Sequence, residues 1–85
     1  MRTPKTHTLK ILPEYYRAVL ERRKTFEVRK NDRDFREGDT LMLEQYDTEL
    51  ARAFGAPLWL RVTYVLTGGQ FGIEDGYCVM GVAIL

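Results

Sequence analysis

The sequence lacks or nearly lacks the residues on which several classes of protein depend. It contains no serine, one cysteine and one histidine among 85 residues. The absence of serine excludes the serine hydrolases, because their nucleophile is missing. The single cysteine, Cys78, excludes an internal disulfide and suits a reducing cytoplasm. Because His7 and Cys78 also lie far apart and form no cluster of zinc ligands, we predict neither a structural metal nor a cofactor.

Long apolar segments are absent as well. No run approaches the roughly 20 apolar residues that a membrane helix needs. The basic start at Arg2 is not followed by the hydrophobic segment of a secretion signal. We therefore expect a cytoplasmic protein that does not engage a membrane. Hydrophobic residues make up 45% of the chain, which is enough for one small core, so residues 1–85 are predicted to form a single domain.

The net charge of +1 conceals an uneven distribution of charged residues. Residues 1–37 hold 11 of the 13 Lys and Arg and 6 of the 12 Asp and Glu, a balance of +5. Residues 38–85 hold 2 basic and 6 acidic side chains, a balance of −4. A molecule that is positive on one side suggests an anionic partner there, and nucleic-acid phosphate is the commonest. Ordinary surface charge explains the same distribution, and both interpretations stay open.

The spacing of apolar residues predicts one helix and five short strands. The helix begins near Pro13, and its apolar stripe consists of Leu12, Tyr15, Tyr16, Val19 and Leu20. The predicted strands are residues 6–11, 25–30, 40–46, 58–67 and 77–84. Residues 47–57 are predicted to form a polar connection with a helical turn around 49–54. This order favours an α+β fold, a small twisted sheet or semi-closed barrel with the helix over one opening.

The segment that follows the predicted helix combines charges of both signs with a strand pattern. Because side chains of a strand alternate between its two faces, we predict that Phe26 and Val28 face the core. The other face then presents Thr25, Glu27 and Arg29 in a row. Such a face could be solvated, or it could form one wall of a pocket for a polar ligand.

Lys24, Glu27 and Arg29 are the first candidate site. A lysine with an altered pKa can act as a base or nucleophile, and a carboxylate can orient a ligand or accept a proton. The same residues could equally form a surface ion-pair ladder that contributes little to stability.

The second candidate is the run from Asn31 to Phe35. Asp32 and Asp34 could bracket Arg33 and hold its guanidinium ready for a phosphate or a base edge. In the alternative interpretation Asp32 caps the turn, Phe35 fills the core and Arg33 is solvated.

The third candidate is the glycine-rich segment from Gly68 to Gly72. Its glycines allow positive φ and close approach of the backbone to a ligand. Gln70 could read donor and acceptor edges, and Phe71 could stack on a base. A plain turn, with Phe71 packed into the core, is the alternative. The remaining singular residues are interpreted as packing: a surface or packed His7 and a buried Cys78.

Three ordered motifs resemble the ASCH domains, most closely a small bacterial and phage subgroup with an Asn-Asp-Arg-Asp-Phe motif. They are Leu9–Tyr16, Lys24–Phe35 and Gly68–Gly72, and together they span most of the chain. The resemblance implies the PUA-like fold, a five- or six-stranded β-barrel with a helix beside a cleft. The family often has glycine just before the lysine pair, where this chain has Arg22. Either the helix runs one residue longer or Arg22 adopts a strained conformation.

The resemblance also implies a function in RNA or nucleoside binding. The expected partner is RNA or a modified nucleoside, held in the cleft by Arg29, Asn31, Arg33, Gln70 and Phe71. As the alternative, one ASCH branch comprises small amidohydrolases that deacetylate acetylcytidine, and other ASCH proteins are ribonucleases. If the protein is an enzyme, the implied catalytic residues are Lys24, Thr25 and Glu27. The sequence leaves the oligomeric state open between a monomer and a dimer.

Overall fold

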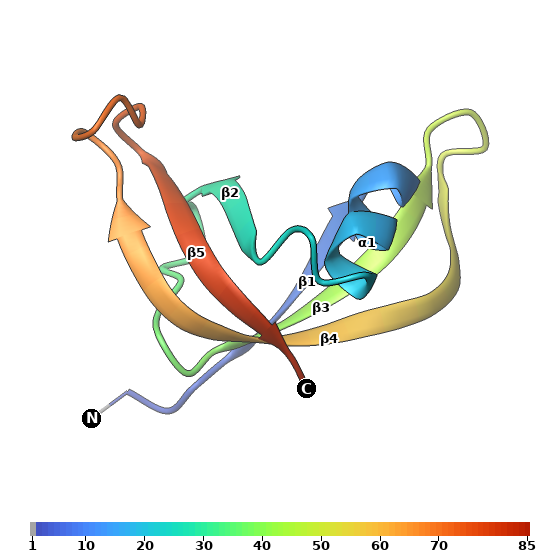
Figure 1. Cartoon of the computed structure of the whole chain (residues 1–85), viewed down its shortest axis with the longest axis horizontal. Helices are drawn as coiled ribbons and strands as arrows, with labels where there is room; N and C mark the ends of the chain where they lie inside the picture. Colours follow the sequence, from blue (N-terminus) through green and yellow to red (C-terminus); the bar gives the residue numbers. More distant parts are fainter. Residues whose placement is uncertain (1) are drawn as a thin grey trace.

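A computed structural model describes residues 2–85 as a curled half-barrel with one short helix (Figure 1). The elements in chain order are β1 (Thr6–Ile11), α1 (Pro13–Leu20), β2 (Phe26–Lys30), β3 (Thr40–Asp47), β4 (Arg52–Thr67) and β5 (Tyr77–Ile84). The fold is therefore α+β, and its barrel-like sheet has five strands. Within residues 2–85 the helix is too short and too polar to cross a membrane.

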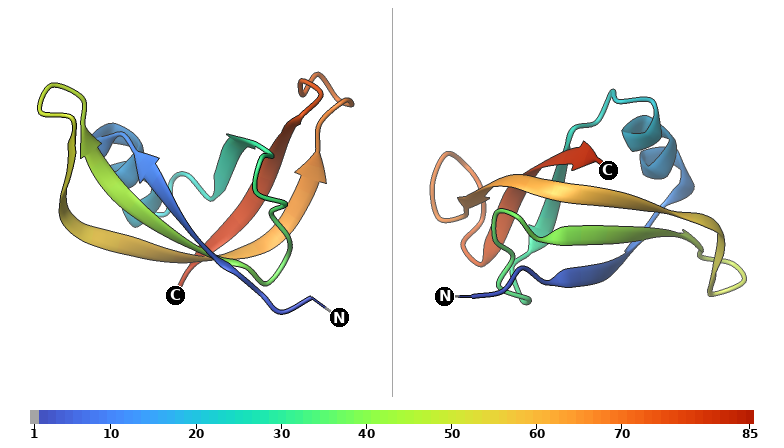
Figure 2. Two further views of the ribbon diagram at one scale, coloured as in Figure 1. Left: turned by 180° about the vertical axis from the view of Figure 1, so that it is seen from behind. Right: turned by 90° about the horizontal axis from the view of Figure 1, so that it is seen from below.

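The strands pair in the order β1-β3-β4-β5-β2. β1 pairs with β3 in parallel, and the other neighbours are antiparallel. The two edge strands, β1 and β2, are thus joined by α1 in sequence but by no ladder in the sheet. Figure 2 shows the long β4 curving along the base of the half-barrel, with β1 on one side of the opening and β2 on the other. The open side of the half-barrel therefore lies between β1, α1 and β2.

The core fills the inner face of the curled sheet. Leu41, Leu43, Leu60 and Met80 are fully buried there, and Val19 packs from α1. β1 alternates strictly, with every second residue buried. The prediction that Cys78 is buried is confirmed, and burial raises the pKa of its thiol.

The connection predicted between the third and fourth strands is wrong in part. β4 begins at Arg52, so residues 52–57 are strand and no helical turn forms around 49–54. The reason is pairing with β3, which continues to Asp47 opposite Arg52 after a bulge near Gln45. The turn itself is short: Asp47 Oδ1 accepts the backbone N–H groups of Glu49 and Leu50 at 2.9 Å.

The alternation predicted for β2 is right, but its faces are reversed. Phe26 and Val28 are 45% and 52% exposed, whereas Glu27 is only 3% exposed. Pairing with β5 sets this register, because Glu27 lies opposite Met80, whose side chain points into the core. A carboxylate can occupy such a position only where cations neutralise it, and β2 has those cations next to it.

The end of the helix decides between the two alternatives for Arg22. The helix ends at Leu20, and Arg22 has a left-handed φ of 62°. The N–H groups of Arg22 and Arg23 donate to the carbonyls of Val19 and Ala18 at 2.9 Å, which closes the helix end. Glycine is usual at this position, and another residue there costs about 1–2 kcal/mol. The helix is therefore not one residue longer, and Arg22 adopts the strained left-handed conformation.

Candidate functional site

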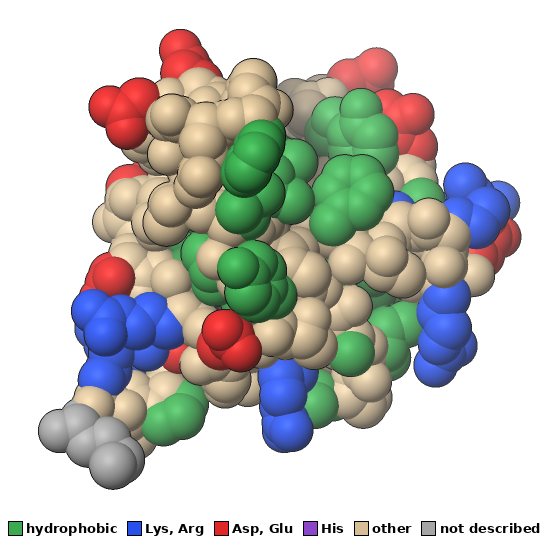
Figure 3. All heavy atoms as spheres, turned by 60° about the vertical axis from the view of Figure 1, so that its left-hand side comes forward, with side chains coloured by type: hydrophobic (Ala, Val, Ile, Leu, Met, Phe, Trp, Pro, Cys, Tyr) green, Lys and Arg blue, Asp and Glu red, His purple; other side chains and the backbone are tan. Residues whose placement is uncertain are grey.

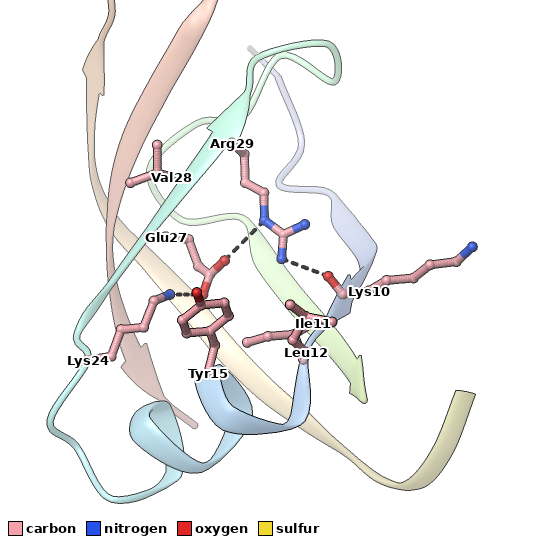
Figure 4. A pocket seen from close by; sticks show the side chains of 8 residues that line it. All are labelled: Lys10, Ile11, Leu12, Tyr15, Lys24, Glu27, Val28 and Arg29. Atoms are coloured by element: carbon pink, nitrogen blue, oxygen red, sulfur yellow. Dashed lines mark hydrogen bonds and ion pairs between the residues drawn. The ribbon is translucent and has the colours of Figure 1, made fainter. Parts of the chain in front are cut away.

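A cleft of about 280 Å³ opens between the two edge strands (Figure 4). One wall comes from the end of β1 and the start of α1, and the other comes from β2 and the residues that lead into it. The lining residues are Lys10, Ile11, Leu12, Tyr15, Lys24, Glu27, Val28 and Arg29. The cleft is thus formed where the barrel lacks a closing strand pair.

Glu27 forms the charged centre of the cleft. Lys24 Nζ donates to Glu27 Oε1 at 2.5 Å, and Arg29 Nε donates to Oε2 at 3.0 Å. Each carboxylate oxygen therefore has one cationic donor, and the three side chains together carry one net positive charge. A carboxylate has about four acceptor positions, so Glu27 can accept further hydrogen bonds from a ligand.

The same cations also bind the backbone at both walls. Lys24 Nζ donates to the carbonyl of Phe26 at 2.8 Å, and Arg29 Nη2 donates to the carbonyl of Lys10 at 2.9 Å. Farther along β1, Arg33 Nη1 donates to the carbonyl of Thr8 at 2.6 Å. These carbonyls lie on the strand edges that have no ladder partner. Side-chain donors therefore satisfy an edge that would otherwise be unpaired and hold the two walls together.

An aromatic side chain completes the cleft. Tyr15 of α1 is 46% exposed, and its ring lies 6.0 Å from Lys24 Nζ. Figure 4 shows Tyr15 reaching toward Glu27, whereas Lys10 points away from the centre. The ammonium of Lys10 lies over the Tyr46 ring at 4.4 Å. The cleft thus combines an aromatic face, a carboxylate acceptor and two cationic donors.

The structure brings together only part of the predicted site. Lys24, Glu27 and Arg29 meet in the cleft, whereas Thr25 lines a separate pocket. Gln70 donates to the carbonyl of Thr67 at 2.9 Å within the β4–β5 loop. Phe71 in that loop is 82% exposed, so it is not packed in the core. Neither Gln70 nor Phe71 lines the cleft.

The Asn31–Phe35 run has mainly a structural role. Asn31 Oδ1 accepts the N–H of Phe35 at 3.2 Å, and Phe35 is buried, as one alternative predicted. Asp34 pairs with Arg36 at 3.0 Å instead of bracketing Arg33. The hydrogen bond from Arg36 lowers the pKa of the Asp34 carboxyl, although burial opposes it. Arg33 lies beside the cleft but outside its lining.

Sequence reasoning missed the other buried carboxylate, Asp39. Arg2 donates to both of its oxygens, at 2.9 and 3.0 Å, and His7 Nε2 lies 2.8 Å from Oδ2. The backbone N–H groups of Lys5 and Arg36 donate to it at 3.0 and 3.1 Å. Burial alone would raise the pKa of Asp39, but these donors, Arg2 foremost, hold it well below its usual range.

A signal for this cluster is present in the strand pattern of β1. His7 shares the alternation of Leu9 and Ile11, so it lies on the buried face. A buried imidazole needs a hydrogen-bond partner, and an acidic residue before a neighbouring strand is a natural source. The structure shows that this residue is Asp39, at the entry to β3. Within residues 2–85, no group of three or more His, Cys, Asp or Glu is placed to hold a metal ion.

The outer face of the β2-β5-β4 ladder carries exposed apolar side chains away from the cleft lining. Phe26, Tyr64 and Tyr77 are exposed there, and the register places Phe26 and Tyr64 on either side of Gly81. Figure 3 shows hydrophobic side chains gathered on this side of the molecule, with charged side chains around them. Tyr64 provides a matched control for Tyr15, whereas the Phe26 ring lies 5.1 Å from Nζ of Lys24, which lines the cleft.

Comparison with known proteins finds a family and one partial relative. The model of a family described as a domain of unknown function, DUF3850, matches residues 6–82. An uncharacterized 12.9 kDa protein in the GpA 3′ region of Escherichia phage P2 is 43% identical over 42 residues. That alignment covers 49% of this chain and 38% of the phage protein, so the chain matches less than half of the relative's length.

Proposed function

Since this chain belongs to the DUF3850 family, whose description leaves its function open, we propose from the cleft that it binds RNA or a nucleoside. In this proposal the base enters between α1 and β2, and Glu27 accepts hydrogen bonds from the base edge. The observation that carries the proposal is the buried Glu27 carboxylate, which is held by two cations and still has free acceptor capacity.

The dimensions and chemistry of the cleft support a ligand of this class. Its volume of about 280 Å³ lies near the lower end of the usual range for small-molecule sites, which suits one base better than a large ligand. Exposed bases are recognised by stacking on aromatic rings and by hydrogen bonds to their edges. Tyr15 offers the ring, Glu27 offers an acceptor for an amino group, and Arg29 offers donors.

The surroundings of the cleft favour a nucleic acid over a neutral ligand. Most basic residues of the chain lie in residues 1–37, which contribute β1, α1 and β2 around the cleft. Lys30 at the end of β2 and Arg33 after it are exposed and could contact phosphate. A half-barrel with its helix beside the cleft also supports the ASCH and PUA-like assignment, which we include in the proposal.

The geometry favours binding over hydrolysis. Lys24 Nζ donates to both the Glu27 carboxylate and the Phe26 carbonyl, so these contacts position it as a hydrogen-bond donor in the cleft and not as an attacking group. Thr25 lies outside the cleft, so the implied trio of Lys24, Thr25 and Glu27 does not assemble. Deacetylation of acetylcytidine or cleavage of RNA is therefore the alternative that the test below can detect.

The test is a titration with a panel of unmodified and modified nucleosides and short RNAs, with the products read by mass spectrometry. Tyr15→Ala should weaken binding by about 1–3 kcal/mol, roughly 5- to 150-fold, because it removes a stacking surface. Tyr64→Ala is the matched control, since Tyr64 is comparably exposed but lies on the outer face of β4.

Two outcomes would contradict the proposal. If Tyr15→Ala bound the ligand as tightly as the control Tyr64→Ala, the cleft would not be the binding site. Conversion of acetylcytidine or RNA that Lys24→Ala abolishes in a folded protein would make the cleft an active site.

A further inference from the structure

A second pocket lies at the other side of Lys24. It has a volume of about 260 Å³ and opens between the end of α1, the start of β2 and the end of β5. Its lining residues are Val19, Arg22, Lys24, Thr25, Leu60, Val82, Ala83 and Ile84. Val19, Leu60 and Val82 are buried and give the pocket an apolar floor. Polar side chains lie only at its rim.

The rim is basic, and no acidic side chain among the described residues 2–85 lines the pocket. The ammonium of Lys24 is already bound to Glu27 in the neighbouring cleft, and Arg23 is paired with Glu21 at 2.7 Å. Arg22 differs from both, because its guanidinium has no hydrogen bond or ion pair within residues 2–85. The pocket therefore combines an apolar floor with one cation, Arg22, that has no counter-charge within residues 2–85.

The backbone of Arg22 points to a role for its side chain. Its φ of 62° is the left-handed conformation in which glycine is usual at the end of a helix. Strained residues that persist are found preferentially at functional sites. Arg22 is exposed at this strained position and forms no ion pair within residues 2–85, so its guanidinium is free to bind a ligand at the rim.

We propose that this second pocket binds a small aliphatic carboxylate, with the branched hydrocarbon on the apolar floor and the carboxylate on Arg22. A guanidinium matches a carboxylate through two parallel hydrogen bonds, and Thr25 at the rim can donate a third. Burial of the hydrocarbon against Val19, Leu60 and Val82 supplies the apolar part of the affinity. This site is independent of the nucleoside proposed for the cleft.

The experiment follows amide chemical shifts of the full chain by two-dimensional NMR during titration with isocaproate. The neutral analogue isocaproamide and the short anion acetate serve as the comparison ligands. Isocaproate should give saturable shifts at Val19, Thr25 and Val82, with the amide analogue roughly tenfold weaker or more because it loses the charged hydrogen bonds. Acetate should be weak because it lacks the hydrocarbon.

Arg22→Gly separates the ligand site from the strain. This variant should raise the melting temperature by a few degrees, because glycine adopts positive φ without penalty, and should lose isocaproate affinity roughly tenfold. Ala51→Gly is the matched control, since Ala51 also has positive φ, at 52°, but lies in the β3–β4 turn. It should relieve strain without changing the affinity.

Several results would overturn this proposal and leave the cleft untouched. They are shifts that do not saturate, equal affinity for acid and amide, unchanged affinity of Arg22→Gly, or shifts at Tyr15 and Glu27 instead. Nucleoside binding in the cleft is measured separately and can succeed or fail without changing these results.

Discussion

Two buried carboxylates, Asp39 just before β3 and Glu27 in β2, are held in different ways. Asp39 is fully buried and receives hydrogen bonds from two backbone N–H groups, both terminal nitrogens of Arg2 and the His7 imidazole. Glu27 is almost as buried, but it receives one hydrogen bond from Lys24 and one from Arg29, and it lines a cleft.

The difference lies in the acceptor capacity that each carboxylate has left. About four acceptor positions are available on a carboxylate, and the donors around Asp39 occupy them all. Glu27 has only two occupied, and its side chain lines the cleft. A saturated buried carboxylate is a structural link between segments, whereas an unsaturated one beside a cleft is a candidate for recognition. Three predictions test this contrast.

The largest effect is expected for Asp39→Asn, measured by urea unfolding. Loss of one partner from a buried ion pair leaves Arg2 without its counter-charge and costs about 3–5 kcal/mol. This is a large share of the about 5–15 kcal/mol that stabilises a domain. Arg2→Gln, which keeps Asp39 and its backbone donors, should cost less. Nucleoside affinity should be unchanged in whichever variant remains folded. A loss below about 1 kcal/mol in both variants would contradict the structural role of Asp39.

The pH dependence of stability should show the same link. The pKa of Asp39 is lower in the folded protein than its ordinary value of 3.8. Its stabilisation is therefore complete above that value and is lost as the pH falls below it toward the folded pKa. When the pH is lowered below about 4, the urea concentration at the unfolding midpoint of the native protein should decrease. In Asp39→Asn this decrease should be smaller. Asp34→Asn is the control, because the pKa of exposed Asp34 is also lowered but solvent screens its contribution. Equal slopes for native protein and Asp39→Asn would contradict the prediction.

Much of the fold follows from local patterns in the sequence. The alternation of β1 and the apolar spacing of α1 predict their elements closely: β1 buries every second residue, whereas α1 buries Val19 and leaves Tyr15 exposed in the cleft. Residues 52–57 escaped prediction because their strand conformation depends on pairing with β3 across a bulge, not on their own composition. A contact of this kind is set by the sheet and leaves no local pattern.

The site was predictable only in part for a similar reason. Alternation along β2 groups Glu27 with Arg29, and Lys24 lies close to them in the sequence just before the strand. Whether that face points inward depends on the register with β5, and hydrophobicity gave the wrong face for Phe26. Asp39 needs partners from the start of the chain, at a sequence distance that no local pattern spans.

The last prediction concerns Glu27→Gln and should show the smallest loss of stability. Lys24 and Arg29 keep their backbone acceptors and reach solvent, so we expect a loss of about 1–2 kcal/mol, smaller than for Asp39→Asn.

Nucleoside binding should nevertheless fall roughly tenfold or more in Glu27→Gln, because the charged acceptor for the base edge is lost. Glu37→Gln, at an exposed turn, is the charge-matched control and should change neither quantity. Calorimetry measures the affinity, and urea unfolding measures the stability. If Glu27→Gln were as destabilising as Asp39→Asn and still bound the nucleoside fully, both carboxylates would be structural. The free acceptor positions of Glu27 would then not take part in binding the nucleoside.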